Sequence, residues 1–132
     1  MPALEPLVGL RVVADPAALD GARWDLPGDS TRPPVVLRFA SDEAFAIGAG
    51  SVTLDDPDAI VEDERGYVGA WCAFDAIRPQ TEWAPPAVRP AIAQGSVAGV
   101  PAKVWLPDDG DVLVVVTAAH AAGLAERLGW PR

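Results

Sequence analysis

The chain has 132 residues, half of them apolar, and a formal net charge of −9. Its length favours one compact domain whose core needs no disulfide bond, and its single cysteine excludes an internal disulfide. The acidic charge argues against nucleic acids and anionic membranes as partners, because phosphate binding needs clustered lysine and arginine. No apolar run approaches the roughly 20 residues of a transmembrane helix, so we expect a cytoplasmic protein.

The first half of the chain alternates strand-like segments with turn residues. Residues 7–14 and 35–40 are rich in apolar and β-branched side chains, and residues 44–48 predict an antiparallel partner of 35–40. Asp15 and Pro16 predict a short helix over residues 16–22, with Asp15 as its N-cap. We expect Trp24 at the edge of the core, a loop over residues 27–34 and a further short strand over residues 51–54.

The middle of the chain is less regular. Residues 55–64 hold six carboxylates, which indicate a solvated acidic face and leave a calcium site as the alternative, with one helical turn at Asp56. Residues 66–74 predict a strand on which Tyr67 and Trp71 share one face, with a bulge or a close backbone approach at Gly69. Four prolines predict an irregular connection over residues 78–90. Residues 90–94 then predict a short helix that Gly95 ends.

The last third reads as a strand, a tight turn, a second strand and a helix. Residues 100–106 and 112–116 are the strands, and Asp109-Gly110 is the pair that best tolerates a tight hairpin. The helix is expected over residues 117–128, with Thr117 as N-cap and Gly129 as the stop. Its apolar stripe is made of Ala121, Leu124, Ala125 and Leu128.

These elements predict an α+β fold. We expect an antiparallel or mixed sheet of about six strands, two or three helices, and the C-terminal helix packed on the sheet. Residues 1–132 are expected to form a single domain.

No catalytic constellation is complete in the sequence. His120 is the only histidine and Cys72 the only cysteine, so a triad or a Cys–His pair would need one or both of them. Cys72 lies among apolar residues, which predicts a buried structural cysteine, and His120 is expected to face solvent. A zinc site needs about four ligands, which one histidine and one cysteine cannot supply. Neither a P-loop nor a Gly-x-Ser-x-Gly motif occurs. We therefore predict no catalytic residue, no metal and no cofactor.

Five tryptophans are many for a chain of this length. Trp83 lies in the proline-rich connection and Trp130 near the end, so both are candidates for an exposed apolar patch that binds a partner. Alternatively, Tyr67 and neighbouring tryptophans could line a pocket for a flat ligand, with an arginine opposite its carboxylate. The candidate ligand- or partner-binding residues are Tyr67, Trp71, Trp83, Trp105, Trp130, Arg38 and Arg78.

Two segments resemble a known family. The turn at residues 41–43 between two strands, and residues 98–105 (AGVPAKVW) followed by a hairpin and a closing helix, resemble the aminomethyltransferase-like fold. The likeness is greatest to the small gamma subunit of heterotetrameric sarcosine oxidases. It covers about half of the chain, residues 55–90 depart from the pattern, and no folate-contacting residue can be matched. The resemblance implies an accessory subunit.

Three functions follow as hypotheses. The first is a non-catalytic protein-binding module, either an accessory subunit of a larger complex or a self-associating unit, whose acidic surface suits a basic partner. The second is a binding protein or enzyme subunit for a small molecule, folate-like or a carboxylate, with an aromatic-lined pocket. The third is a carboxylate metal site at residues 55–64, which calcium would stabilise.

Overall fold

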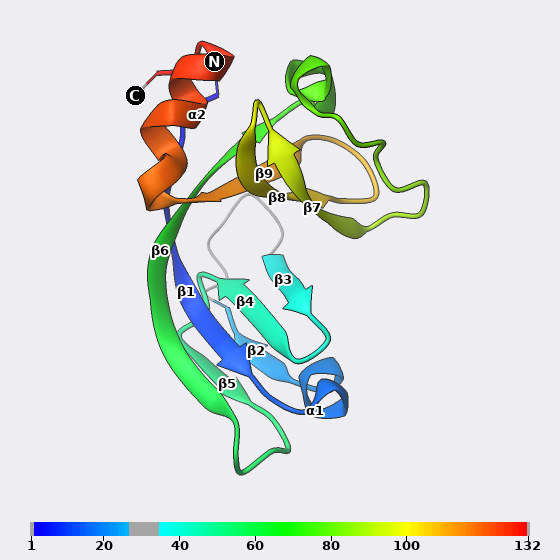
Figure 1. The fold of residues 1–132 in the computed structure, drawn as a ribbon. Coiled ribbons are helices and arrows are strands. Elements are labelled where there is room, and N and C mark those ends of the chain that lie inside the picture. Colours follow the sequence, from blue (N-terminus) through cyan, green and yellow to red (C-terminus); the bar gives the residue numbers. More distant parts are fainter. Residues whose placement is uncertain (1, 27–34, 132) are drawn as a thin grey trace. The chain divides into compact units, whose positions relative to one another are not determined.

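The computed structural model describes residues 2–26 and 35–131, which form nine strands, two α-helices and three short 3-10 helices (Figure 1). Seven strands are hydrogen-bonded in the order β3-β4-β1-β6-β9-β8-β7, and β2 and β5 form a separate pair. Strands therefore dominate the α+β fold, and the main sheet is larger than the six strands predicted. The two α-helices agree with the predicted number.

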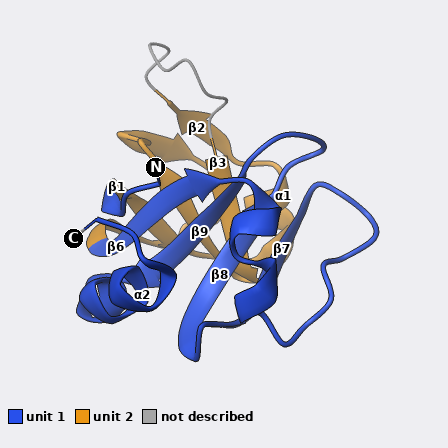
Figure 2. Cartoon of the chain, turned by 90° about the horizontal axis from the view of Figure 1, so that it is seen from above, with its two compact units in different colours: residues 1–6, 66–132 blue, residues 7–65 orange. Residues whose placement is uncertain are grey.

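The contacts between residues divide the chain into two compact units, which Figure 2 distinguishes by colour. Unit 1 contains residues 1–6 and 66–132, and unit 2 contains residues 7–65. Each unit has its own hydrophobic cluster, so each is described by itself.

Unit 2 is organised around β4 (Glu43–Ile47), which is antiparallel to both β1 (Glu5–Val13) and β3 (Val35–Ala40). The predicted hairpin between β3 and β4 is confirmed. Gly9 of β1 faces Ile47 in the register, and a Cβ atom there would collide with the carbonyl oxygen of Ala46. The close approach of the two backbones therefore requires glycine at this position.

The remaining elements of unit 2 close its hydrophobic cluster. Helix α1 (Pro16–Asp20) begins after Asp15 as predicted, although the Asp15 side chain forms no capping hydrogen bond. Strands β2 (Arg23–Asp25) and β5 (Ser51–Thr53) pair with each other, and Trp24 packs half-buried against the cluster. The loop predicted over residues 27–34 lies outside the described residues. The cluster consists of Leu10, Val12, Ala14, Leu19, Ala44, Ala46 and Ala49.

At Asp56 the acidic segment forms a single hydrogen-bonded turn, in which the backbone N–H of Ala59 donates to the Asp56 carbonyl at 3.2 Å, and this turn does not continue into a helix. The Asp56 carboxylate accepts hydrogen bonds from the backbone N–H of Asp15 at 2.8 Å and of Asp58 at 2.9 Å. These bonds favour the charged form and lower the pKa of Asp56, the bond from Asp15 having the larger effect. From Ile60 onward the segment is already part of the long strand β6 (Ile60–Cys72).

The sheet of unit 1 is an antiparallel series of four strands. Residues 67–72 of β6 pair with β9 (Val112–Thr117), β9 pairs with β8 (Val100–Leu106), and β8 pairs with β7 (Ala91–Val97). The predicted hairpin of β8 and β9 is confirmed, and Gly110 in its turn has the expected positive φ of 83°. The pairing of β6 with β9 continues through Gly69 without a bulge.

The prediction of a helix over residues 90–94 is wrong, because residues 91–94 belong to β7. All seven residues of β7 pair with β8, from Ala91 opposite Leu106 to Val97 opposite Val100. A helix of five residues is marginal by itself, and continuous pairing with a neighbouring strand outweighs it. The proline-rich connection before β7 is irregular as predicted, apart from the short 3-10 helices η1 (Phe74–Ala76) and η2 (Arg78–Gln80).

The C-terminal helix packs on one face of this sheet, as predicted (Figure 1). Helix α2 (Ala121–Leu128) starts later than expected, because the 3-10 helix η3 (Ala118–His120) precedes it. Thr117 is the last residue of β9, and its side chain caps neither helix. Gly129 ends α2 in the left-handed conformation, with φ of 72°. Leu124 and Ala125 of α2 are fully buried against alternate residues of β6, β8 and β9.

Candidate functional site

Polar side chains gather on the face of the unit 1 sheet that α2 does not cover. Tyr67 on β6 is opposite Thr117 on β9, and Lys103 on β8 lies between Val115 on β9 and Gln94 on β7. Because side chains alternate along each strand, these five residues share the face opposite to Val114 and Val116, which belong to the same cluster as Leu124 and Ala125 of α2.

A cavity of about 250 Å³ opens at this place, and all of its lining residues belong to unit 1. We call it the Lys103 cavity. It is lined by Tyr67, Gln94, Gly95, Pro101, Ala102, Lys103, Val115, Val116, Thr117 and His120. Four strands and η3 thus contribute to one concave site.

Two contacts position the polar groups of the Lys103 cavity. The Lys103 ammonium lies 5.8 Å from the centroid of the Tyr67 ring, a cation–π distance. The Thr117 hydroxyl lies 3.0 Å from Nδ1 of His120. If the hydroxyl donates to Nδ1, the imidazole carries its proton on Nε2 and can donate there. The first contact orients the Lys103 ammonium, and the second orients the His120 imidazole.

Of the predicted ligand-binding residues, Tyr67 is the one that lines the cavity. Trp71 and Trp105 lie on the same face of the sheet, where each is paired with Leu113. This cross-strand row is the one after the row of Lys103 and Val115, and neither tryptophan lines the cavity. The separation of four positions between Tyr67 and Trp71 corresponds to about 13 Å along a strand. The three aromatic residues therefore do not line this cavity together, and a binding role for Trp71 and Trp105 stays a prediction.

Neither predicted arginine lines the cavity. Arg38 lies on β3 in unit 2, where its guanidinium binds the Asp20 carboxylate at 2.7 Å and the Ser41 carbonyl at 2.6 Å. Arg78 lies on η2 of unit 1, 5.9 Å from the Phe74 ring centroid and 3.9 Å from the Asp75 carboxylate. The cation at the cavity is Lys103.

The two tryptophans expected at an exposed patch differ in their surroundings. Trp130 is only 8% exposed and belongs to the core cluster, because its backbone N–H bonds to the Ala125 carbonyl and folds the chain back after Gly129. Its predicted exposure is wrong. Trp83 is half-buried, and its indole N–H donates to the Ser96 carbonyl at 2.9 Å. A binding role for either residue stays a prediction.

Cys72 and His120 do not form a catalytic pair. Cys72 is 3% exposed on the core face of β6, where it is opposite Val112, whereas His120 is exposed beyond the other end of β9. Burial raises the pKa of the Cys72 thiol to about 11, with a smaller contribution from the charge of Asp111. A thiol with this pKa is protonated and unreactive at neutral pH, as expected of a structural cysteine.

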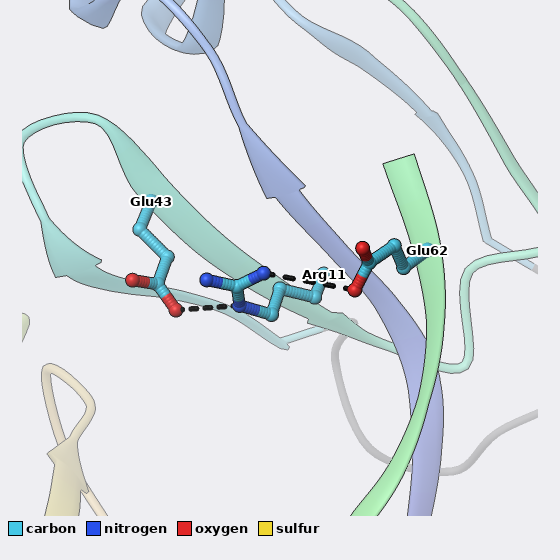
Figure 3. A network of polar contacts seen from close by, with 3 residues as sticks. All are labelled: Arg11, Glu43 and Glu62. Carbon is cyan, nitrogen blue, oxygen red and sulfur yellow. Dashed lines mark hydrogen bonds and ion pairs between the residues drawn. The ribbon is translucent and has the colours of Figure 1, made fainter. Parts of the chain in front are cut away.

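A second polar cluster lies in unit 2, where Arg11 sits between Glu43 and Glu62 (Figure 3). The Arg11 Nε is 2.9 Å from Glu43, and its Nη1 is 3.7 Å from Glu62. The hydrogen bond and charge of Glu43 raise the pKa of Arg11. Because all three side chains are more than a quarter exposed, we read this cluster as a surface ion-pair network that joins neighbouring strands.

Within residues 2–26 and 35–131, no group of three or more His, Cys, Asp or Glu side chains is arranged to hold a metal ion. Among the same residues, no helix has the length and apolarity needed to cross a bilayer.

The sequence pattern missed most of the cavity. Gln94 was expected in a helix, and Lys103 and His120 carried no motif, because their neighbourhood depends on pairing between four strands. One signal was present: Lys103 alternates with buried residues of β8, which places it on the face away from the core.

Comparison with solved structures identifies a similar fold. One chain of the heterotetrameric sarcosine oxidase from Corynebacterium sp. U-96, solved in complex with pyrrole 2-carboxylate, matches with a TM-score of 0.67. The match covers 97% of this chain and 80% of that chain, at 13% sequence identity. The resemblance predicted from residues 41–43 and 98–105 is thus confirmed as a likeness of fold. By sequence, no family model and no curated protein matches the chain.

Proposed function

We propose that this chain is an accessory subunit that binds a protein partner within a larger enzyme complex. The observation that supports the proposal most is the likeness of fold to a chain of a heterotetrameric enzyme, which extends over 97% of the present chain. A likeness of fold that extends over nearly the whole chain supports a role as a subunit more strongly than a likeness confined to a short motif would.

The side chains are consistent with a role in binding. The single cysteine and the single histidine lie apart, because Cys72 is buried on the core face of β6 and His120 is exposed on η3 after the end of β9. Val88 is 81% exposed in the connection that precedes β7, and Ile60 of unit 2 is 51% exposed. Single exposed apolar side chains are common on protein surfaces, so Val88 and Ile60 serve here as positions at which a partner contact is tested.

The proposal is tested by isolating the chain, carrying an affinity tag, from the native host at its normal expression level. We expect native mass spectrometry to show a hetero-oligomer of fixed stoichiometry, with a larger partner that carries the catalytic site. A chain that is recovered by itself, as a monomer or a homo-oligomer, would contradict the proposal.

Two variants separate a specific surface from general loss of structure. Val88→Asp places a charge at the exposed apolar position and should reduce partner recovery severalfold. Ala122→Asp places the same charge at an exposed position of α2 and serves as the matched control. Equal recovery with both variants would show that the surface around Val88 is not the contact.

A further inference from the structure

The Lys103 cavity has no role in partner binding as proposed above, yet it brings together side chains from β6, β7, β8, β9 and η3. We propose that it is a binding site for a small organic monocarboxylate with a compact apolar body. The inference rests on the charge, donor groups and volume of the cavity.

The charge of the lining is suited to an anion. The whole chain carries a net charge of −9, but the ten lining residues include the cation Lys103 and no aspartate or glutamate. Lys103 is held 5.8 Å from the Tyr67 ring centroid, so its ammonium is oriented before a ligand arrives. A preoriented cation loses less conformational entropy on binding than a mobile surface lysine.

Three residues that line the cavity, Gln94, Lys103 and His120, carry hydrogen-bond donors. An ammonium has three N–H donors and a carboxamide has two, so Lys103 and Gln94 can each bind a ligand oxygen in addition to a partner within the protein. The hydroxyl of Thr117 fixes the ring of His120 through Nδ1, which leaves Nε2 as the other polar atom of the ring. These groups can hold both oxygens of one carboxylate by charge-assisted hydrogen bonds.

The volume and the apolar part of the lining define the rest of the ligand. A cavity of about 250 Å³ lies below the roughly 300–1,000 Å³ of pockets for drug-sized ligands, which argues against a folate-sized molecule here. Pro101 and the Tyr67 ring supply apolar surface beside the cation. A single ring or short branched chain attached to one carboxylate matches this combination.

The test is titration of the isotope-labelled full chain with benzoate, followed by NMR of its backbone amides. We expect saturable shifts centred on Lys103, Val115 and Thr117. Benzamide has the same shape without the charge, and should bind about tenfold more weakly because the charge-assisted bonds are lost. Inorganic phosphate has charge without an apolar body, and should also bind more weakly than benzoate.

Matched variants locate the cation. Lys103→Met keeps an unbranched apolar side chain and should weaken benzoate binding about tenfold, whereas Arg78→Met, at an exposed cation outside the cavity, should change it less than about twofold. If Lys103→Met does not fold, the comparison of benzoate with benzamide on the unmodified chain still decides the question.

Three results would overturn the proposal: no saturable shift with benzoate, shifts centred on residues outside the cavity, or equal affinity for benzoate and benzamide. Phosphate binding as tight as benzoate would overturn the apolar part of the assignment. The measurement uses the chain alone, so it succeeds or fails independently of the proposed protein partner.

Discussion

At the scale of single residues, two glycines show how local space decides the effect of the same substitution. A Cβ atom on Gly95 would lie 2.8 Å from Cδ1 and Nε1 of Trp83, whereas nothing lies within 4 Å of a Cβ atom on Gly123 of α2. Trp83 cannot move freely, because its indole bonds to the Ser96 carbonyl and its ring packs 6.1 Å from Phe74.

We therefore expect Gly95→Ala to lower the free energy of unfolding by roughly 1–3 kcal/mol through overpacking. Gly123→Ala should raise it by about 0.5–1 kcal/mol, because alanine is the better helix former. Urea denaturation followed by tryptophan fluorescence measures both. Equal effects of the two substitutions would show that the contact with Trp83 does not constrain β7.

Cys72 provides a prediction for the dependence of stability on pH. Burial raises the pKa of its thiol from the ordinary value of 9.0 to about 11, so the folded state favours the protonated thiol. The contribution of Cys72 to the free energy of unfolding is fully present below about pH 9 and is lost as the pH rises towards 11. The total loss is on the order of 2 kcal/mol. Urea denaturation between pH 8 and 11 should show this loss, and Cys72→Ala should show a shallower one.

A thiol reagent checks the same assignment independently. We expect Cys72 to be unreactive in the folded chain at about pH 8 and fully reactive in urea, because reaction needs an exposed thiolate. Rapid labelling of the folded chain would contradict the burial of this side chain.

At the scale of elements, the turn between β7 and β8 has only two residues, Ala98 and Gly99, because Val97 pairs with Val100. Both have positive φ, 52° and 77°, as the tightest hairpin turns require. This conformation costs alanine about 1–2 kcal/mol, whereas glycine adopts it readily.

We expect Ala98→Gly to stabilise the chain by about 0.5 kcal/mol. The backbone strain that it removes at the turn is larger than the stability it loses through the greater conformational entropy of the unfolded chain. Gly99→Ala should destabilise it by about 1–2 kcal/mol, because it adds the same strain and brings a Cβ atom to 3.0 Å from Nη1 of Arg127. Thermal denaturation with matched buffers measures both signs. A loss of stability with Ala98→Gly would contradict the turn geometry.

Helix α2 gives a second prediction for an element. Leu124 is fully buried against the sheet of unit 1, and Glu126 is exposed on the same helix. We expect Leu124→Ala to cost about 2–5 kcal/mol by leaving a cavity, and Glu126→Ala to cost less than about 0.5 kcal/mol. Chemical denaturation of both variants tests whether α2 is part of the core or only rests on it.

At the scale of the whole molecule, the net charge of −9 sets the expected partners. Phosphate backbones repel such a chain, so we expect no retention on immobilised duplex DNA even at about 50 mM salt, where electrostatic binding is strongest. A basic protein of similar size, run in parallel, confirms that the column binds. Retention that decreases with salt would show a local basic surface and contradict the prediction.

Much of the fold could be predicted because it depends on local pattern. The alternation in β3 and β8, the continuous apolar run of β9, and the stop at Gly129 follow from residues within one segment. The burial of Cys72 followed from its apolar neighbours for the same reason. Periodicity and turn residues act over a few positions, and the sequence presents them directly.

The candidate site was decided by tertiary structure. Residues 91–94 became a strand because β8 was available as a partner, and that pairing carried Gln94 beside Lys103. Trp130 became buried because the chain turns back after Gly129, although its position near the end suggested exposure. The Lys103 cavity joins residues as far apart in the chain as Tyr67 and His120, through hydrogen bonds between β6 and β9. Sequence spacing determines which side chains share a face of one strand, but only the pairing between strands determines which faces meet to form a site.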